Sequence, residues 1–315
     1  MTLQTSTTVR LNNGVEMPVL GLGTWQAAPT LTATAVQEAL SAGYRHIDAA
    51  WIYMNQKEVG EGIRLSKIPR ANIFLVSKLW MVHFHPSRVR KAVDEILADL
   101  SVDYLDQLLL HWPVPWKVTD ESTEQWYLPK DADGNALVDE SVELQETWAE
   151  VEQLYVEGKL RSIGVSNFSV KELQRILEHA KVKPQVNQVE LHIRLPQKNL
   201  KAFCDQNSIQ VVGYAPLGSP GAMGVTSVIE DTVVAAIAKK HETSPAGVLI
   251  RWSLQKGNVV IPKSTDPGRI RSNISCFNFQ LDDADIVALD AIGEASPQRI
   301  FNPAFRAGGK KVFSE

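Results

Sequence analysis

The sequence predicts an α/β protein, a (β/α)₈ barrel. Short, nearly continuous apolar runs alternate with helix-like patterns along almost the whole chain, which favours parallel strands with both faces of the sheet covered. Eight such strand–helix units in 315 residues match a closed barrel in size and count. The structural alternative, an open doubly wound sheet, normally carries G-x-G-x-x-G after its first strand. Here GLGTWQ (21–26) has Gln26 where the third glycine belongs, so the barrel is favoured.

The predicted elements follow in a regular order. A hairpin comes first, because the turn signal Asn13-Gly14 lies between two short extended runs, and we expect it to cover the bottom of the barrel. The eight strands are predicted at 17–25, 45–50, 72–80, 104–112, 161–168, 184–191, 209–217 and 258–264. A helical pattern follows each, for example from Pro86, where apolar residues recur on one face. The longest irregular stretches are 113–141 and 296–315.

No linker or internal repeat marks a second domain, so residues 1–315 are predicted to form one domain, with 1–8 flexible. The composition, 44% hydrophobic and 22% charged, is that of an ordinary globular protein. A net charge of −4 gives no reason to expect nucleic acid or an anionic membrane as partner. The start, MTLQTSTTVR, lacks the basic-then-apolar form of a secretory signal, and two cysteines make no disulfide framework, so we expect a cytoplasmic protein.

Polar side chains gather at the predicted carboxyl ends of the strands, which form one rim of the barrel. These are Asp48, Lys78, His111, Ser166, Asn167, Gln188, Tyr214, Lys263 and Ser264, with Tyr53 just beyond the second strand. Each has an ordinary structural explanation by itself: a cap, a packed ring or a hydrogen-bonded core group. Their coincidence on the second, third and fourth strands favours a catalytic set.

The chemistry of that set suits carbonyl reduction. A phenol and a lysine both titrate near pH 10, but an ammonium beside a phenol favours the phenolate and lowers the phenol's pKa. Asp48 would keep Lys78 charged and oriented, and Tyr53 could then give a proton to an oxygen that is becoming an alkoxide. His111 could hydrogen-bond the same oxygen. Hydrolysis fits poorly, because no nucleophile–base pair is apparent.

Other rim residues could hold a hydride donor. Tyr214 offers a ring for stacking on a nicotinamide, and Ser166, Asn167 and Gln188 could bond its carboxamide. At the eighth strand, IPKSTDPGRIRSN (261–273) places cations at the start of a helix, as in a phosphate site. The simpler alternative for that segment is a capped helix with solvated basic side chains.

The sequence resembles the aldo-keto reductases from about residue 8 to residue 295. GLGTW, GYRHIDAAWIYMNQKEVG, VSKLW, LLLHWP, IGVSNF, QVNQVELH and IPKS recur in that family in this order and spacing. The resemblance implies an NADPH-dependent (β/α)₈ enzyme, active as a monomer or homodimer on a small carbonyl compound. It implies Tyr53 as general acid, Lys78 and Asp48 as its partners, and His111 as the residue that orients the carbonyl.

The resemblance also implies the cofactor-binding positions. These are Thr24, Trp25, Asp48, Ser166, Asn167, Gln188, Tyr214, Leu217, Ser219, Lys263, Ser264, Thr265, Arg269 and Asn273. Three departures stand out. Asp266 replaces a frequent threonine near the phosphate, and Ser272 replaces a glutamate near the adenine, which leaves NADH open as a second cofactor. The segment APLGSPGAMG after Tyr214 is short, so we expect a reduced loop over the cofactor.

Aromatic residues at the rim predict the substrate site. We expect its wall to contain Trp25, Trp51, Trp80, His111, Trp112 and Phe301. DAAWIY resembles the fungal glycerol dehydrogenase and glyceraldehyde reductase branch, so short polar aldehydes such as glyceraldehyde and aldoses are the expected substrates.

Three alternatives stay open. Glycerol oxidation could be the working direction, and a non-catalytic, redox-sensing nicotinamide-binding subunit would use the same cofactor site. A barrel hydrolase could bind a metal through HFH (83–85), although we expect no metal.

Overall fold

The computed structural model describes residues 3–219, 227–302, 308 and 312–313. An antiparallel hairpin of β1 (Thr8–Arg10) and β2 (Glu16–Pro18) opens the chain, as predicted. The amide of Asn12 donates to the carbonyls of Pro184 and Ser208, which lie just before two barrel strands, so the hairpin covers the bottom of the barrel. Of the segment expected to be flexible, residues 1–2 lie outside the described residues, and Thr8 already pairs with Pro18.

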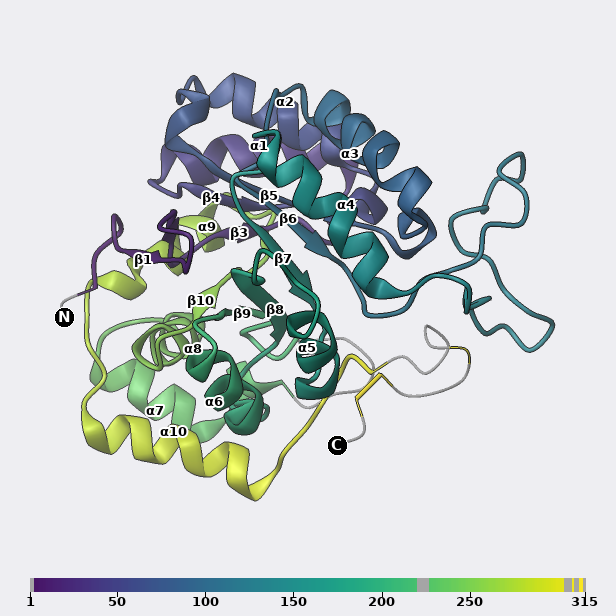
Figure 1. Ribbon diagram of the computed structural model, residues 1–315. Coiled ribbons are helices and arrows are strands. Elements are labelled where there is room, and N and C mark those ends of the chain that lie inside the picture. The colour runs from purple at the N-terminus through teal and green to yellow at the C-terminus, as the bar shows by residue number, and fades with distance from the viewer. Residues whose placement is uncertain (1–2, 220–226, 303–307, 309–311, 314–315) are drawn as a thin grey trace.

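Eight parallel strands form the barrel, which confirms the predicted (β/α)₈ fold (Figure 1). They are β3 (Leu22–Gly23), β4 (His46–Asp48), β5 (Phe74–Leu79), β6 (Gln107–Leu110), β7 (Ile163–Ser166), β8 (Val186–Glu190), β9 (Gln210–Tyr214) and β10 (Val259–Val260). Each pairs with its neighbour in chain order. Parallel bridges from Leu20 to Val260 and from Gly23 to Lys263 join the first strand segment to the last and close the sheet.

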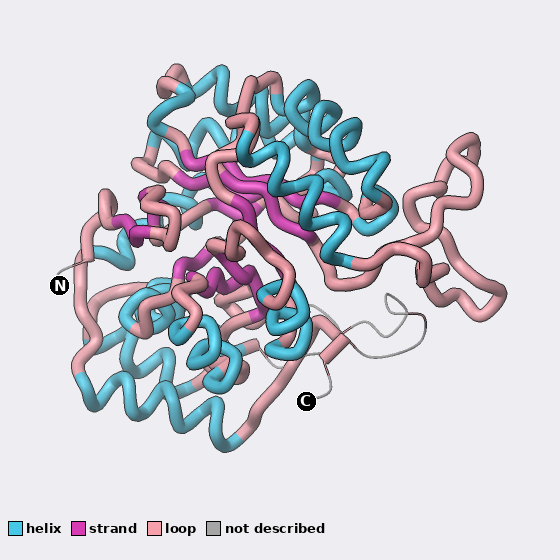
Figure 2. The backbone as a smooth tube through the Cα atoms, viewed as in Figure 1, coloured by secondary structure: helices cyan, strands magenta, loops and turns pink. Residues whose placement is uncertain are grey.

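Helices surround the strands, as Figure 2 shows. They are α1 (Pro29–Ser41), α2 (Gln56–Ser66), α3 (Pro86–Leu100), α4 (Leu144–Val156), α5 (Val170–Leu177), α6 (Lys198–Gln206), α7 (Thr232–Lys240), α8 (Pro245–Gln255), α9 (Pro267–Ile274) and α10 (Asp283–Ala295). A (β/α)₈ barrel needs one helix after each strand. Two of the helices are additional: α7, which precedes α8 after β9, and α10, which follows α9 after β10. They pack together, and Lys240 of α7 binds Asp282 and Asp285 at the start of α10.

The long segment 113–141 between β6 and α4 projects from the barrel in Figure 1 and contains no helix. Five short 3₁₀ turns complete the described structure: η1 (Trp51–Tyr53), η2 (Arg70–Asn72), η3 (Met81–His83), η4 (Val228–Glu230) and η5 (Ser275–Phe277). Two of them, η1 and η3, follow β4 and β5 directly at the carboxyl rim. They therefore deliver side chains to the end of the barrel where the predicted site lies.

Candidate active site

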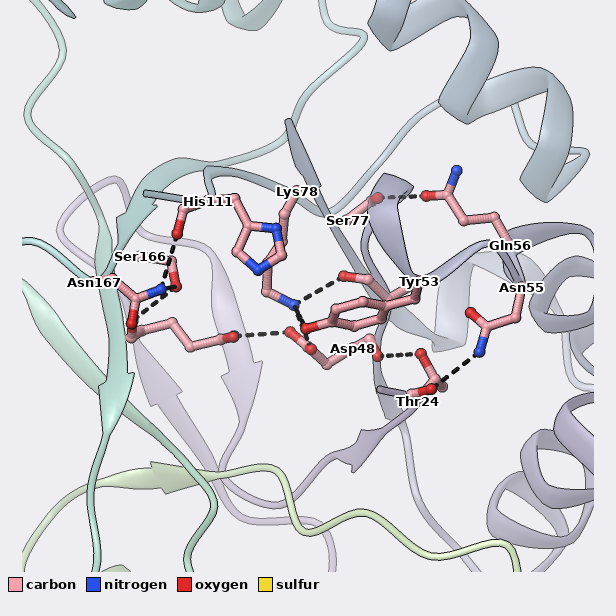
Figure 3. A network of polar contacts seen from close by, with 12 residues as sticks. Thr24, Asp48, Tyr53, Asn55, Gln56, Ser77, Lys78, His111, Ser166 and Asn167 are labelled. Carbon is pink, nitrogen blue, oxygen red and sulfur yellow. Dashed lines mark hydrogen bonds and ion pairs between the residues drawn. The ribbon is translucent and has the colours of Figure 1, made fainter. Parts of the chain in front are cut away.

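A buried lysine connects an aspartate and a tyrosine at the rim (Figure 3). The Nζ of Lys78, on β5, donates to Oδ1 of Asp48 at 2.5 Å and to the hydroxyl oxygen of Tyr53 at 3.2 Å. Asp48 ends β4, and Tyr53 ends the η1 turn that follows. The predicted convergence of these three residues is therefore present in the structure.

The electrostatics of the pair depend on its burial. The side chains of Lys78 and Asp48 are 1% and 2% exposed. Burial lowers the pKa of the Lys78 ammonium, because the charged form loses its hydration, and the carboxylate of Asp48 opposes that shift. A cation held at the tyrosine oxygen stabilises negative charge that develops there.

Asp48 is itself held on two sides. Gln188, on β8, donates its amide Nε2 to Asp48 Oδ2 at 2.7 Å. Thr24 donates its hydroxyl to the Asp48 backbone carbonyl at 2.8 Å. Both residues were expected to contact a cofactor. In the structure Gln188 fixes the carboxylate that orients Lys78, and Thr24 fixes the backbone of the same aspartate.

Polar residues beside the catalytic positions fix the backbone of the site. Asn55 is buried and donates to the carbonyl of Thr24 at 3.0 Å. Gln56 accepts a hydrogen bond from Ser77, the residue before Lys78, at 2.5 Å. The first contact joins the segment after Tyr53 to the residue that follows β3, and the second joins it to β5. The sequence analysis missed both residues, although polar side chains so close to Tyr53 were a usable signal.

His111 lies beside Tyr53, with the two ring centroids 5.8 Å apart. Asn167 follows β7 with a φ of 63° and donates its amide to the His111 carbonyl at 2.9 Å. The hydroxyl of Tyr214 donates to Asn167 Oδ1 at 2.8 Å, and Ser166 Oγ lies 3.1 Å from the Asn167 amide. These predicted cofactor positions thus form one hydrogen-bonded chain beside the catalytic set.

The start of α9 carries the second predicted cofactor region. Lys263 and Arg269 are exposed, whereas Ser264 and Asn273 are buried. Asp266 caps the helix, since its carboxylate accepts the Arg269 backbone N–H at 2.7 Å. The structure therefore shows a capped helix with one exposed cation before it, Lys263, and one in its first turn, Arg269. This arrangement is common to the predicted phosphate site and to the simpler alternative of solvated basic side chains. Thr265 and the remaining predicted positions, Leu217 and Ser219 after β9, are partly buried.

An aromatic cluster walls one side of the rim. The ring of Trp51 contacts Trp126 at 5.8 Å and Tyr127 at 6.0 Å between centroids, and contacts His83 at 4.6 Å. Trp126 and Tyr127 come from the segment 113–141, and the indole N–H of Trp80 donates to the Tyr127 carbonyl at 2.8 Å. The sequence analysis missed these two residues, because an irregular loop has no periodicity that tells which of its rings faces the barrel.

Of the other residues predicted to form the wall, some are exposed at the rim and some are buried. Trp25 is 42% exposed and packs edge-on against Phe301, with centroids 5.5 Å apart. Phe301 also contacts Tyr214 at 5.8 Å. Trp80 and Trp112 are 1% and 5% exposed, so their rings are buried rather than part of an open surface.

The HFH segment (83–85) does not act as one unit. His83 is buried among aromatic rings, and burial lowers its pKa to about 4. His85 instead accepts the backbone N–H of Ser87 at the start of α3. Within 3–219, 227–302 and the three other described residues, no three His, Cys, Asp or Glu side chains gather as a metal site would require. The two histidines of this segment therefore lie in separate environments.

A family model described as the aldo/keto reductase family matches residues 19–294, a span that contains all eight barrel strands. The chain belongs to the aldo/keto reductase family. It is therefore an oxidoreductase, as the sequence predicted. In the part of this aldo/keto reductase that the structure describes, we find no helix long and apolar enough to cross a membrane.

Individual relatives agree with this assignment. This aldo/keto reductase is 39% identical to aldo-keto reductase family 1 member A1 of Rattus norvegicus, covering 98% of this chain and 95% of the relative. It is 41% identical to aldose reductase B of Dictyostelium discoideum, covering 92% and 93%. Its structure resembles that of the aldose reductase from Schistosoma japonicum, with a TM-score of 0.90, 37% identity and coverage of 98% and 99%.

The family generally uses NADPH or NADP⁺, and the residues of this aldo/keto reductase fit such a group. The half-buried ring of Tyr214 and the amide of Asn167 suit a nicotinamide and its carboxamide. Lys263 and Arg269 suit a phosphate near the first turn of α9. The predicted reduced loop is the segment APLGSPGAMG (215–224), and its second half, 220–224, lies outside the described residues.

Proposed function

We propose that this aldo/keto reductase reduces aldehydes and ketones to alcohols with NADPH, and that Tyr53 is the general acid. The supporting observation is the position of Lys78 Nζ, 3.2 Å from the Tyr53 oxygen and 2.5 Å from Asp48. When bound, NADPH supplies a hydride. Tyr53 gives its proton to the carbonyl oxygen, and the negative charge left on the phenol oxygen is stabilised by Lys78.

The neighbouring residues would place the substrate. His111 lies beside Tyr53 and orients the carbonyl oxygen toward the phenol. Asn167 fixes the His111 backbone, and Gln188 fixes Asp48. Each of these contacts is made within the protein before the substrate arrives, so little reorganisation is needed during the proton transfer.

Small polar aldehydes such as glyceraldehyde, or aldoses, are the proposed substrates. The support is twofold: aromatic rings wall the rim beside Tyr53, and relatives of this chain carry the name aldose reductase. The opposite direction, NADP⁺-dependent oxidation of a polyol such as glycerol, uses the same groups with Tyr53 accepting the proton. Rates measured in both directions at one pH tell which is favoured.

The test is NADPH consumption with glyceraldehyde, aldoses and aromatic aldehydes, measured for the native protein and for Tyr53→Phe. We expect Tyr53→Phe to lower kcat by about 10²–10⁴-fold, the usual contribution of a general acid, with NADPH binding retained. Tyr155→Phe, on the barrel-covering helix α4, is the matched control and should keep full activity. NADPH binding without turnover of any substrate would favour the redox-sensing alternative instead.

Three further properties belong to the same proposal: a single domain over residues 1–315, a monomer or homodimer, and a cytoplasmic location. Limited proteolysis, light scattering and cell fractionation test them in turn.

A further inference from the structure

A fully buried carboxylate lies at the end of β8, outside the catalytic set. Glu190 is 0% exposed, and its side chain extends to the start of the C-terminal segment. Its Oε1 accepts the backbone N–H of Ile300 at 2.8 Å, and its Oε2 accepts that of Phe301 at 2.8 Å. The Nε2 of His192 lies 2.9 Å from Oε1. The two oxygens of one side chain therefore hold two successive amides of a segment 110 residues away.

Such a carboxylate is costly to bury unless donors surround it, and hydrogen bonds to a charged acceptor are stronger than those between neutral groups. Here two of the donors are the backbone N–H groups of Ile300 and Phe301, in the C-terminal segment that follows α10 and is called the tail below. The carboxylate and the tail therefore stabilise each other. Neighbouring hydrogen bonds also attach this segment to the barrel: the backbone N–H of Gln298 donates to the Arg194 carbonyl at 2.9 Å. The amide of Asn302 donates to the Phe313 carbonyl at 2.8 Å.

The anchored residue Phe301 reaches the reaction site. Its ring contacts Tyr214, which pairs with Glu190 in the β8–β9 register, and it contacts the exposed indole of Trp25. Gln188, two residues before Glu190 on the same strand, holds the catalytic Asp48. Side chains two apart on a strand share a face, so β8 supports both the catalytic carboxylate and the tail.

We propose that Glu190 is a positioning residue for substrate. Its carboxylate fixes the Ile300–Phe301 backbone, and so places the Phe301 ring where it packs against the part of a carbonyl compound that extends beyond the reacting group. The ligand class concerned is carbonyl compounds with an aromatic or apolar substituent. A short polar aldehyde is too small to depend on this contact. The inference rests on the proposed function.

The test is Glu190→Gln, which keeps the size of the side chain. An amide offers one acceptor oxygen, and its NH₂ faces the second backbone N–H, so one of the two bonds is lost and the tail is released. We expect KM for benzaldehyde to rise about tenfold, with kcat, the glyceraldehyde KM and the NADPH Kd changed by less than about twofold. Glu152→Gln is the matched control: this buried carboxylate accepts the Val182 N–H at 2.8 Å, and it should change none of these constants.

A double variant distinguishes positioning from a general loss of structure. If Glu190 acts through Phe301, Glu190→Gln should have almost no further effect on the benzaldehyde KM in a Phe301→Ala background. An equal effect on both aldehydes, or an undiminished effect in that background, would overturn the proposal.

If Glu190→Gln does not fold, hydrogen exchange on the native chain tests whether Glu190 anchors the Ile300–Phe301 backbone. Amides of Ile300 and Phe301 that exchange as slowly as those of the barrel strands support the anchor, and exchange at open-chain rates overturns it. If the proposed function itself is wrong, the native protein reduces neither benzaldehyde nor glyceraldehyde. That result differs from every outcome named above for the Glu190 proposal.

Discussion

The buried ion pair of Asp48 and Lys78 leads to a prediction about stability that is independent of turnover. Asp48→Asn keeps the shape of the side chain but removes its charge. The ammonium of Lys78, with its side chain 1% exposed, then lies beside a neutral amide. The new amide can also accept only through one oxygen, although both Lys78 and Gln188 donate to this side chain in the native protein.

The size of the effect follows from the burial of both partners. Removing one member of a buried pair costs about 3–5 kcal/mol, because the other charge loses its compensation. For a chain of 315 residues this lowers Tm by about 5–8 °C. Lys78→Met alone should cost a similar amount, since it leaves the Asp48 carboxylate buried without its cation.

The double variant Asp48→Asn, Lys78→Met removes both charges together. We expect its loss to be smaller than the sum of the two single losses by about 2 kcal/mol. Urea unfolding followed by circular dichroism, at one pH and ionic strength, gives the three free energies. Losses that simply add would refute the reasoning, because they would mean that the pair contributes no coupling energy.

Three further predictions concern other parts of the molecule. Asp266→Asn keeps a good helix cap but removes a negative charge from the first turn of α9, so NADPH should bind about threefold to tenfold more tightly while NADH changes less, as measured by fluorescence titration. Gly60→Ala should destabilise the protein by about 3 kcal/mol, despite the better helix propensity of alanine, because the new Cβ would lie 2.4 Å from the backbone oxygen of Leu100; thermal unfolding of the variant checks this. Burial lowers the pKa of His83 from 6.5 to about 4, so between these values the unfolded chain binds a proton that the folded chain does not. The contribution of His83 to stability should therefore fall by up to about 3 kcal/mol as the pH decreases through that window, and His83→Phe should remove this contribution from the pH–stability profile.

The sequence predicted the barrel, which the structure confirms, and it predicted which polar side chains meet at the carboxyl rim. Asp48, Lys78 and His111 come at or next to the ends of consecutive strands, and parallel strands in a closed barrel bring their carboxyl ends to one rim. Local pattern and count were enough for this, because strand period and strand order do not depend on the detailed path of the loops.

Which distant side chains contact that rim depends on the three-dimensional packing of the chain. Gln188 lies 140 residues from Asp48, and its amide could have faced a cofactor or the carboxylate; packing directs it to the carboxylate. Trp126 joins Trp51 from an irregular loop, and Glu190 holds the tail at Phe301 across 111 residues. Such contacts have no sequence period, since they depend on how loops and termini fold back over a finished barrel, and that is set by the free energy of the whole chain rather than by any local stretch of it.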